Sequence, residues 1–138
     1  MIQTALDLIR KRWDFDVLVM ENMFGDILSD LAGGLVGGMG TSACAEIGDH
    51  TGLFQPAHSS APDIMGQNKS NPMAASLSGG LMLDDLSEKL ERPKLAGAAG
   101  LIKSAVYKGF EENLLRPMKF GSDMGTKEVT RQVIDLIH

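Results

Sequence analysis

Two aspartates, Asp26 and Asp30, lie four residues apart in the segment GDILSD. If this segment is helical, the spacing makes their carboxylates neighbours on one face, where like charges repel by roughly 0.2–0.5 kcal/mol. A divalent cation would relieve that repulsion, and carboxylate oxygens are the ligands that Mg²⁺ and Mn²⁺ prefer. Two solvated carboxylates near a helix start would show the same spacing, because negative charge is favoured there. The spacing alone therefore leaves a metal site and a plain helix surface both open.

A second candidate site is the segment HSSAPDIMGQNKSNP, which combines a histidine, hydroxyl groups, an aspartate and an asparagine. It ends at a predicted helix start, and helix N-termini with exposed loop amides suit phosphate groups. Asp63 could accept hydrogen bonds from a ribose diol, while its charge would repel a 2′-phosphate, which favours NAD over NADP. The segment has no GxGxxG fingerprint and would not be a Rossmann site. A capped surface loop carrying His58 is the alternative interpretation.

Helices are needed to hold these side chains, and the hydrophobic spacing predicts them on both sides of each segment. Asn71 as N-cap and Pro72 at the first helical position form a strong helix start. The helix that carries the aspartate pair should bury a stripe formed by Ile27, Leu28, Leu31 and Leu35. Helices are expected over residues 4–11, 24–36, 72–86, 93–114 and 126–137.

Strand patterns lie between the helices. Residues 14–20 contain a continuous, partly β-branched apolar run that predicts a strand buried on both faces. Short strands are expected over residues 43–47 and 53–58, joined by a Gly/Asp turn. The mixture of helices and strands indicates the α/β class.

The composition excludes some classes of protein. Of 138 residues, 43% are hydrophobic and 22% charged, as in a globular domain. The net charge of −5 disfavours nucleic acid and anionic membranes as general partners. No apolar run approaches the roughly 20 residues that span a bilayer, and the first residues do not form a secretory signal. The single cysteine, Cys44, fits a buried thiol in a reducing compartment, so we expect a cytoplasmic protein.

The two segments, taken together and in this order, resemble the isocitrate/isopropylmalate dehydrogenase family. FDVLVMENMFGDILSD is similar to that family's strand–turn–helix with metal-binding aspartates, and GLFQPAHSSAPDIMGQNKSNP to its NAD-binding loop, usually written EPVHGSAPDI…ANP. The later segments ASLSGGLMLDDL and SDMGTKEVT match in order and character, so the resemblance covers essentially the whole chain. It implies a partial fold of the family, a sheet with flanking helices. Residues 1–37 would be a remnant of the substrate and dimerisation domain, and residues 38–138 the C-terminal part of the cofactor-binding domain.

The resemblance also implies roles for residues of both segments. Asp26 and Asp30 would coordinate Mg²⁺ or Mn²⁺ together with the substrate. The family reaction oxidises a 2-hydroxy acid by hydride transfer and then releases CO₂ from its β-carboxylate, with the metal acting as a Lewis acid. The adenosine part of NAD would be surrounded by His58, Ser60, Ala61, Asp63, Ile64 and Asn71.

Departures from the family pattern shape the functional expectation. Family members are much longer, and an N-terminal part outside this sequence would carry the substrate-binding arginines and the acid/base tyrosine and lysine. We therefore expect no catalytic residue in this chain. A third metal-binding aspartate, donated in the family by the partner subunit, would fall at position 2, where this sequence has Ile2. Ser59 replaces the usual loop glycine, which hinders a close backbone approach to a ligand.

Two functions remain as hypotheses. The chain is the C-terminal fragment of an NAD- and metal-dependent dehydrogenase, inactive alone and acting on a small 2-hydroxy acid once an N-terminal part completes it. Alternatively, it is a non-catalytic structural or regulatory chain that keeps the fold. Either way, an incomplete sheet would leave an unpaired edge and exposed apolar surface. We therefore expect a homo-oligomer or a complex with a partner chain.

Overall fold

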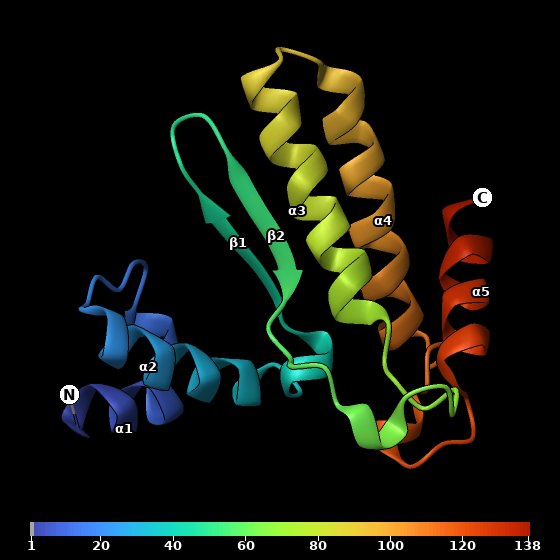
Figure 1. Cartoon of the computed structure of the whole chain (residues 1–138), viewed down its shortest axis with the longest axis horizontal. Helices are drawn as coiled ribbons and strands as arrows, with labels where there is room; N and C mark the ends of the chain where they lie inside the picture. Colours follow the sequence, from blue (N-terminus) through green and yellow to red (C-terminus); the bar gives the residue numbers. More distant parts are fainter. Residues whose placement is uncertain (1) are drawn as a thin grey trace.

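The computed structural model describes residues 2–138 as helices combined with one pair of strands (Figure 1), in line with the expected α/β class. Its helices and strands are α1 (Ile2–Arg10), α2 (Asn22–Leu35), β1 (Ala43–Ile47), β2 (Gly52–Pro56), α3 (Met73–Lys89), α4 (Pro93–Glu111) and α5 (Thr126–Ile137). Within the described residues, no helix is both long enough and apolar enough to cross a membrane.

The hairpin and the last helices pack side by side. β1 and β2 are antiparallel, with Ala43 opposite Pro56 and Ile47 opposite Gly52. α3 contacts both strands on one side and α4 on the other, and α5 packs against α4 (Figure 1). α1 and α2 form a separate pair that leads into the hairpin through a short 3-10 turn, Met39–Thr41. The two predicted short strands are thus confirmed, with β2 beginning and ending slightly earlier than expected.

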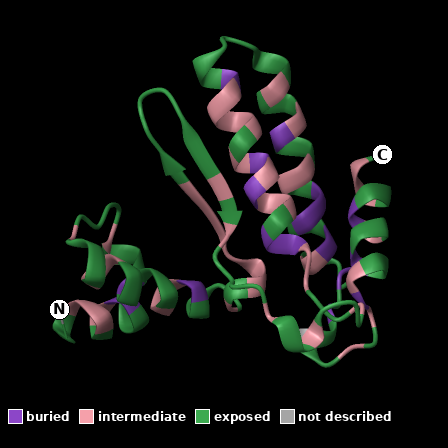
Figure 2. Ribbon diagram, viewed as in Figure 1, coloured by how far each residue is buried: buried purple, intermediate pink, exposed green. Residues whose placement is uncertain are grey.

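The buried core lies where α3, α4 and α5 meet (Figure 2). Met73 at the start of α3, Val106 in α4 and Val129 in α5 are fully buried and belong to one cluster. Val133, one turn after Val129, joins them. The four-residue spacing of Val129 and Val133 places both on one face of α5.

The strand predicted over residues 14–20 is wrong. The segment begins in a 3-10 turn, Arg12–Asp14, and then continues without regular structure. Val17 and Val19 leave 81% and 94% of their surface exposed. The apolar run is typical of a central strand, but such a strand needs neighbours on both edges. The only sheet in the described part of the chain is the hairpin, which does not reach it.

α2 forms close to its predicted place, but its apolar stripe is only partly covered. The helix begins at Asn22, two residues before the expected start, and Glu21 occupies the N-cap position. Leu28 is buried, whereas Ile27 and Leu35 remain 52% and 40% exposed. The stripe needs more apolar surface than α1 and the following 3-10 turn supply.

The bounds of α3 and α4 differ from the prediction at their C-terminal ends. α3 continues to Lys89, beyond residue 86, and α4 stops at Glu111, before residue 114. α4 ends because the amides of Leu114 and Leu115 both turn back to the Gly109 carbonyl at 2.8 Å. Asn113 adopts a left-handed conformation with φ of 58°, which asparagine tolerates better than most residues.

Candidate functional site

Asp26 and Asp30 lie one turn apart on α2, and both are exposed. The hydroxyl of Ser29 donates to the main-chain carbonyl of Asp26 at 3.1 Å, which leaves the Asp26 carboxylate out of that bond. Among residues 2–138, no third acidic residue, histidine or cysteine joins the pair to form a group that could hold a metal ion. The prediction that both aspartates lie on one helix is confirmed. An octahedral ion bound here would take its other ligands from water, substrate or another chain.

The second segment forms a loop beside a cavity of about 400 Å³, and we call it the cofactor loop (residues 57–72). The loop leaves β2, makes a 3-10 turn at Pro62–Ile64 and returns to the start of α3 (Figure 1). The cavity wall brings together most of the predicted site residues, namely His58, Ser60, Ala61, Ile64 and Asn71. Asp63 is exposed and does not line the cavity.

Some residues on the cavity wall were missed by the sequence analysis. Met39 and Gly40 come from the 3-10 turn after α2, far from the cofactor loop in sequence, so no local pattern indicates them. Lys69 lies within the loop, and its charge was a usable signal because a cation suits a phosphate-binding site. The Lys69 ammonium donates to Oε1 of Gln67 at 2.8 Å. Next to the cavity, the imidazole Nδ1 of His58 lies 3.0 Å from the Ser59 carbonyl oxygen.

The cofactor loop contains a strained residue at its 3-10 turn. Ala61 has φ of 42° and ψ of 63°, a left-handed conformation that costs an L-residue roughly 1–2 kcal/mol. The turn is held by the amide of Ile64, which donates to the Ala61 carbonyl at 3.2 Å. The side-chain amide of Gln67 donates to the Asp63 carbonyl at 2.6 Å. Strain of this kind persists only where surrounding contacts enforce it, and it clusters at ligand sites.

Asn71 closes the cofactor loop and carries an unsatisfied donor. Its Oδ1 accepts a hydrogen bond from the Met73 amide at 3.2 Å. α3 therefore starts beside Asn71 as expected, but Pro72 and not Asn71 occupies the N-cap position, and Met73 is the first helical residue. Its Nδ2 is buried and has no partner among the described residues. A Cβ at Gly40 would lie 3.3 Å from that nitrogen, so the glycine leaves it room. A buried donor without an acceptor costs about 1–3 kcal/mol, and a ligand with an acceptor atom would recover this energy.

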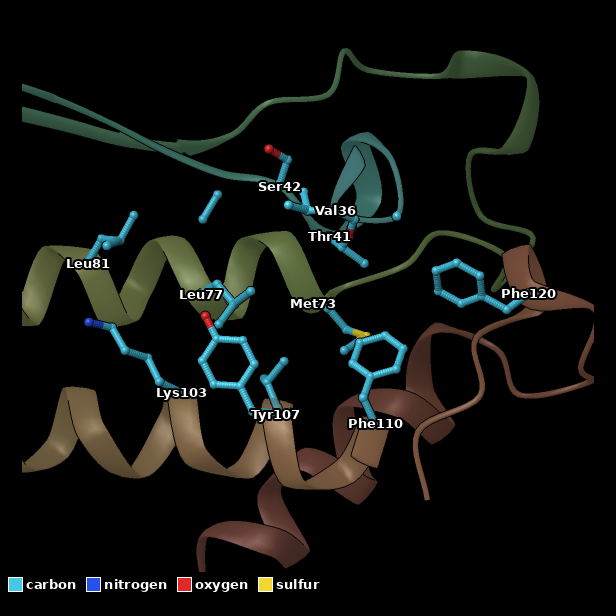
Figure 3. A pocket seen from close by; sticks show the side chains of 13 residues that line it. Val36, Thr41, Ser42, Met73, Leu77, Leu81, Lys103, Tyr107, Phe110 and Phe120 are labelled. Carbon is cyan, nitrogen blue, oxygen red and sulfur yellow. The ribbon is translucent and has the colours of Figure 1, made fainter. Parts of the chain in front are cut away.

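A larger cavity of about 660 Å³ lies between the start of the hairpin and the α3–α4 pair (Figure 3). Leu77 and Phe110 are typical of its mostly apolar wall. Lys103 on this wall is ion-paired with Asp84. Tyr107, the single tyrosine of the sequence, reaches the cavity from α4. This wall offers few converging polar groups, so it has the character of a packing surface and not of a cofactor site.

Comparison with known proteins gives the same family over the whole described chain. The family model for isocitrate/isopropylmalate dehydrogenase matches residues 2–137. The isocitrate/homoisocitrate dehydrogenase of Thermus thermophilus is 41% identical over 96% of this chain, and the 3-isopropylmalate dehydrogenase of Methanothermobacter thermautotrophicus is 42% identical over 94% of it. Each alignment covers 37% of the relative, so the chain spans well under half the length of these curated proteins.

Solved structures show the same relationship. An isocitrate dehydrogenase from Methylococcus capsulatus superposes with a TM-score of 0.86 and 35% identity, over 99% of this chain and 39% of that one. The apo form of a beta-decarboxylating dehydrogenase from Thermococcus kodakarensis gives a TM-score of 0.81 and 36% identity, over 99% and 38% of the two chains. Both confirm the predicted fold as a portion of a larger one.

Proposed function

The chain belongs to the isocitrate/isopropylmalate dehydrogenase family, and on that premise we propose that it is the C-terminal portion of an NAD- and Mg²⁺- or Mn²⁺-dependent dehydrogenase. Such an enzyme oxidises a small 2-hydroxy acid and decarboxylates it. Relatives are named for isocitrate, homoisocitrate and 3-isopropylmalate, and the proposal does not choose among these acids. Residues 1–37 would belong to its substrate and dimerisation domain and residues 38–138 to its cofactor domain. The supporting observation is the cavity in which most of the expected NAD residues meet.

The adenosine part of NAD would occupy the cavity beside the cofactor loop. The buried Nδ2 of Asn71 supports this placement, because a ligand acceptor would satisfy it. The N-terminus of α3 and the Lys69 ammonium both favour negative phosphate groups. Asp63 would bind the ribose diol and repel a 2′-phosphate. When bound, NAD supplies the hydride acceptor, and the residues of this chain bind and orient it.

Asp26 and Asp30 would hold the divalent ion. The ion supplies Lewis-acid chemistry at the substrate hydroxyl. Both carboxylates are exposed, and two carboxylates with water bind such ions weakly. We therefore propose that the substrate and another chain provide the remaining ligands, and that the isolated chain is inactive.

Association with another chain is part of the proposal. The exposed side chains of Val17, Val19 and Ile27 support it, because apolar surface of this kind often marks an interaction site. The partner would be a second copy or a chain that carries the rest of the family fold. We place the complex in the cytoplasm, where a free, half-buried thiol such as Cys44 stays reduced.

A non-catalytic structural or regulatory chain is the second candidate. Ser59 is the observation that favours it. This residue lines the cavity at a position where the family loop usually has glycine. A side chain there hinders the close approach of a ligand to the backbone.

Thermal melting with NAD, with NADP, and with NAD plus Mn²⁺ would test the proposal. A ligand at about 100 times its Kd stabilises the folded state by roughly 2.7 kcal/mol, which raises Tm by several degrees. We expect NAD to raise Tm more than NADP, and Asp63→Ala to remove that difference. Asp49→Ala is the matched control, because it removes an exposed carboxylate from the hairpin turn.

A cooperatively melting chain whose Tm responds to neither nucleotide at millimolar concentration would contradict the NAD site. That outcome would favour the non-catalytic candidate. Ser59→Gly would then identify the cause, because recovery of the NAD response would show that the serine blocks an otherwise competent loop.

A further inference from the structure

The cofactor loop is tied to the last helix of the chain. The amides of Thr126 and Lys127 donate to the main-chain oxygen and to Oδ1 of Asn68, at 3.0 and 2.9 Å. In the opposite direction, Nδ2 of Asn68 donates to Oε2 of Glu128 at 2.9 Å. The Thr126 hydroxyl also donates to the Ser70 carbonyl at 2.6 Å. The loop and the first turn of α5 therefore exchange hydrogen bonds in both directions.

Asn68 supplies the cap that α5 lacks in its own sequence. α5 begins after Gly125, which has no side chain to accept a hydrogen bond from the first amides of the helix. Such amides have no partner within the helix. Asn68 accepts from two of them, one with its main-chain oxygen and one with its side chain. Its φ of 59° is left-handed, a conformation that asparagine tolerates.

The fit between Asn68 and Gly125 is close. A Cβ placed on Gly125 would overlap both the side-chain amide and the main-chain oxygen of Asn68. Gly125 is buried, and its backbone lies directly against Asn68. The missing side chain at position 125 is what allows the loop to reach the helix.

Asn68 directly precedes Lys69, Ser70 and Asn71, which line the cavity beside the cofactor loop. We infer that Asn68 is a positioning residue, which holds the second arm of the loop against α5 and thereby sets the affinity for the nucleotide. A helix that does not itself line the cavity thus controls binding there. The inference rests on the proposed function, because it takes the ligand of the cavity to be NAD.

Variants on both sides of the contact can test this role. Glu128→Ala removes the acceptor on α5 and leaves the loop sequence unchanged. Glu128→Gln keeps an acceptor oxygen for Asn68 and serves as the conservative rescue. Asn68→Gly removes the side chain from the loop while the left-handed backbone stays accessible. Asp135→Ala, which changes another exposed acidic residue of α5, is the matched control.

Amide hydrogen exchange of residues 66–71 and the Kd for NAD would be measured on the full chain. We expect both Glu128→Ala and Asn68→Gly to speed exchange in these residues. Glu128→Ala loses one hydrogen bond and should raise the Kd about threefold, and Asn68→Gly loses two side-chain bonds and should raise it further. The double variant Asn68→Gly/Glu128→Ala should resemble Asn68→Gly, because the hydrogen bond that Glu128→Ala removes is already absent from Asn68→Gly. Glu128→Gln, which keeps an acceptor but loses the charge, should lie between Glu128→Ala and the wild type. Asp135→Ala should behave as the wild type.

If residues 66–71 of Glu128→Ala exchange at the wild-type rate, the inference is overturned, even if that variant is less stable. Glu128 would then stabilise α5 alone and not the cofactor loop. Faster exchange with an unchanged Kd would overturn the role in binding. If the wild-type chain binds no NAD, the proposed function fails. Faster exchange in Glu128→Ala would in that case still support the link between the loop and α5.

Discussion

The side-chain oxygen of Asn71 accepts a hydrogen bond from the Met73 amide at 3.2 Å, so a single asparagine starts α3 and also borders the cavity. Asn71→Ala removes this acceptor, and loss of a helix cap costs about 1 kcal/mol. Asn71→Ser keeps an acceptor oxygen of similar capping strength and, like Asn71→Ala, lacks the unsatisfied Nδ2, so it should be about 1 kcal/mol more stable than Asn71→Ala. Equilibrium unfolding in urea would measure both differences. Equal destabilisation by the two variants would contradict the capping role.

The packing of Gly109 predicts a destabilising effect of a single methyl group. A Cβ on this buried glycine of α4 would lie 2.5 Å from Cδ1 of Leu115 and 2.9 Å from Cδ1 of Leu136. Overpacking of this kind costs about 1–3 kcal/mol. That exceeds the gain of up to about 1 kcal/mol that alanine brings over glycine inside a helix. Gly109→Ala should therefore lower the stability measured by urea unfolding.

Gly100→Ala provides the matched control on the same helix. A Cβ at Gly100 would meet no atom within 4 Å, so only the helix propensity changes. This variant should gain about 0.5–1 kcal/mol. If Gly109→Ala were stabilised as much as Gly100→Ala, the tight packing of Leu115 against α4 would be refuted.

The Glu128 carboxylate predicts a pH dependence of stability. Its pKa is lowered below the ordinary 4.5, mainly by the hydrogen bond from Asn68, with further help from backbone amides and the Lys127 charge. A lowered folded-state pKa gives a stabilising contribution that is present above pH 4.5 and is lost as the pH falls through the folded value. Glu128→Gln cannot lose a carboxylate charge there.

Urea unfolding at a series of pH values would check this prediction. The difference in free energy of unfolding between wild type and Glu128→Gln should shrink as the pH falls below 4.5. Glu111→Gln, which removes an exposed glutamate from α4, is the control for a general carboxylate effect. Parallel pH profiles of wild type and Glu128→Gln would contradict the prediction.

From the spacing of Asp26 and Asp30, we expect the substitution Asp30→Asn to raise Tm without metal and to reduce the stabilisation by added metal. Without metal, Asp30→Asn removes a like-charge repulsion of roughly 0.2–0.5 kcal/mol and should raise Tm slightly. With millimolar Mn²⁺, the wild type should gain stability by mass action, whereas the variant should gain less. Asp135→Asn on α5 is the control. The same Mn²⁺ response in wild type and Asp30→Asn would place the bound ion elsewhere.

The parts of the fold that depend on residues close together in the sequence could be predicted from the sequence. The start of α3 follows from Asn71 and Pro72, whose effects act within one helical turn. The hairpin follows from two short patterns joined by a turn. Residues 14–20 were misjudged because their apolar run predicts burial, while burial depends on partner strands that the described chain does not supply.

The candidate site shows the same division. Residues of the cofactor loop were indicated by their own sequence and by family resemblance. Met39 and Gly40 reach the cavity only through folding of the chain after α2, so no spacing rule could indicate them. The bond between Asn68 and Glu128 joins residues 60 positions apart, and single-sequence patterns carry no information at that range.

We expect the chain to self-associate through the exposed segment before α2, on the face that carries Val17 and Val19. Val17 and Val19 alternate along the chain and are both largely exposed, and an unpaired apolar stretch can add to the edge of another sheet. The double variant Val17→Thr/Val19→Thr keeps β-branched side chains but makes this face polar. Sedimentation equilibrium should show a larger weight-average mass for the wild type than for the double variant. Val36→Thr, at a separate exposed valine after α2, is the control and should associate as the wild type does. A wild type that stays monomeric at high concentration, or a double variant that associates equally, would show that this segment does not drive assembly.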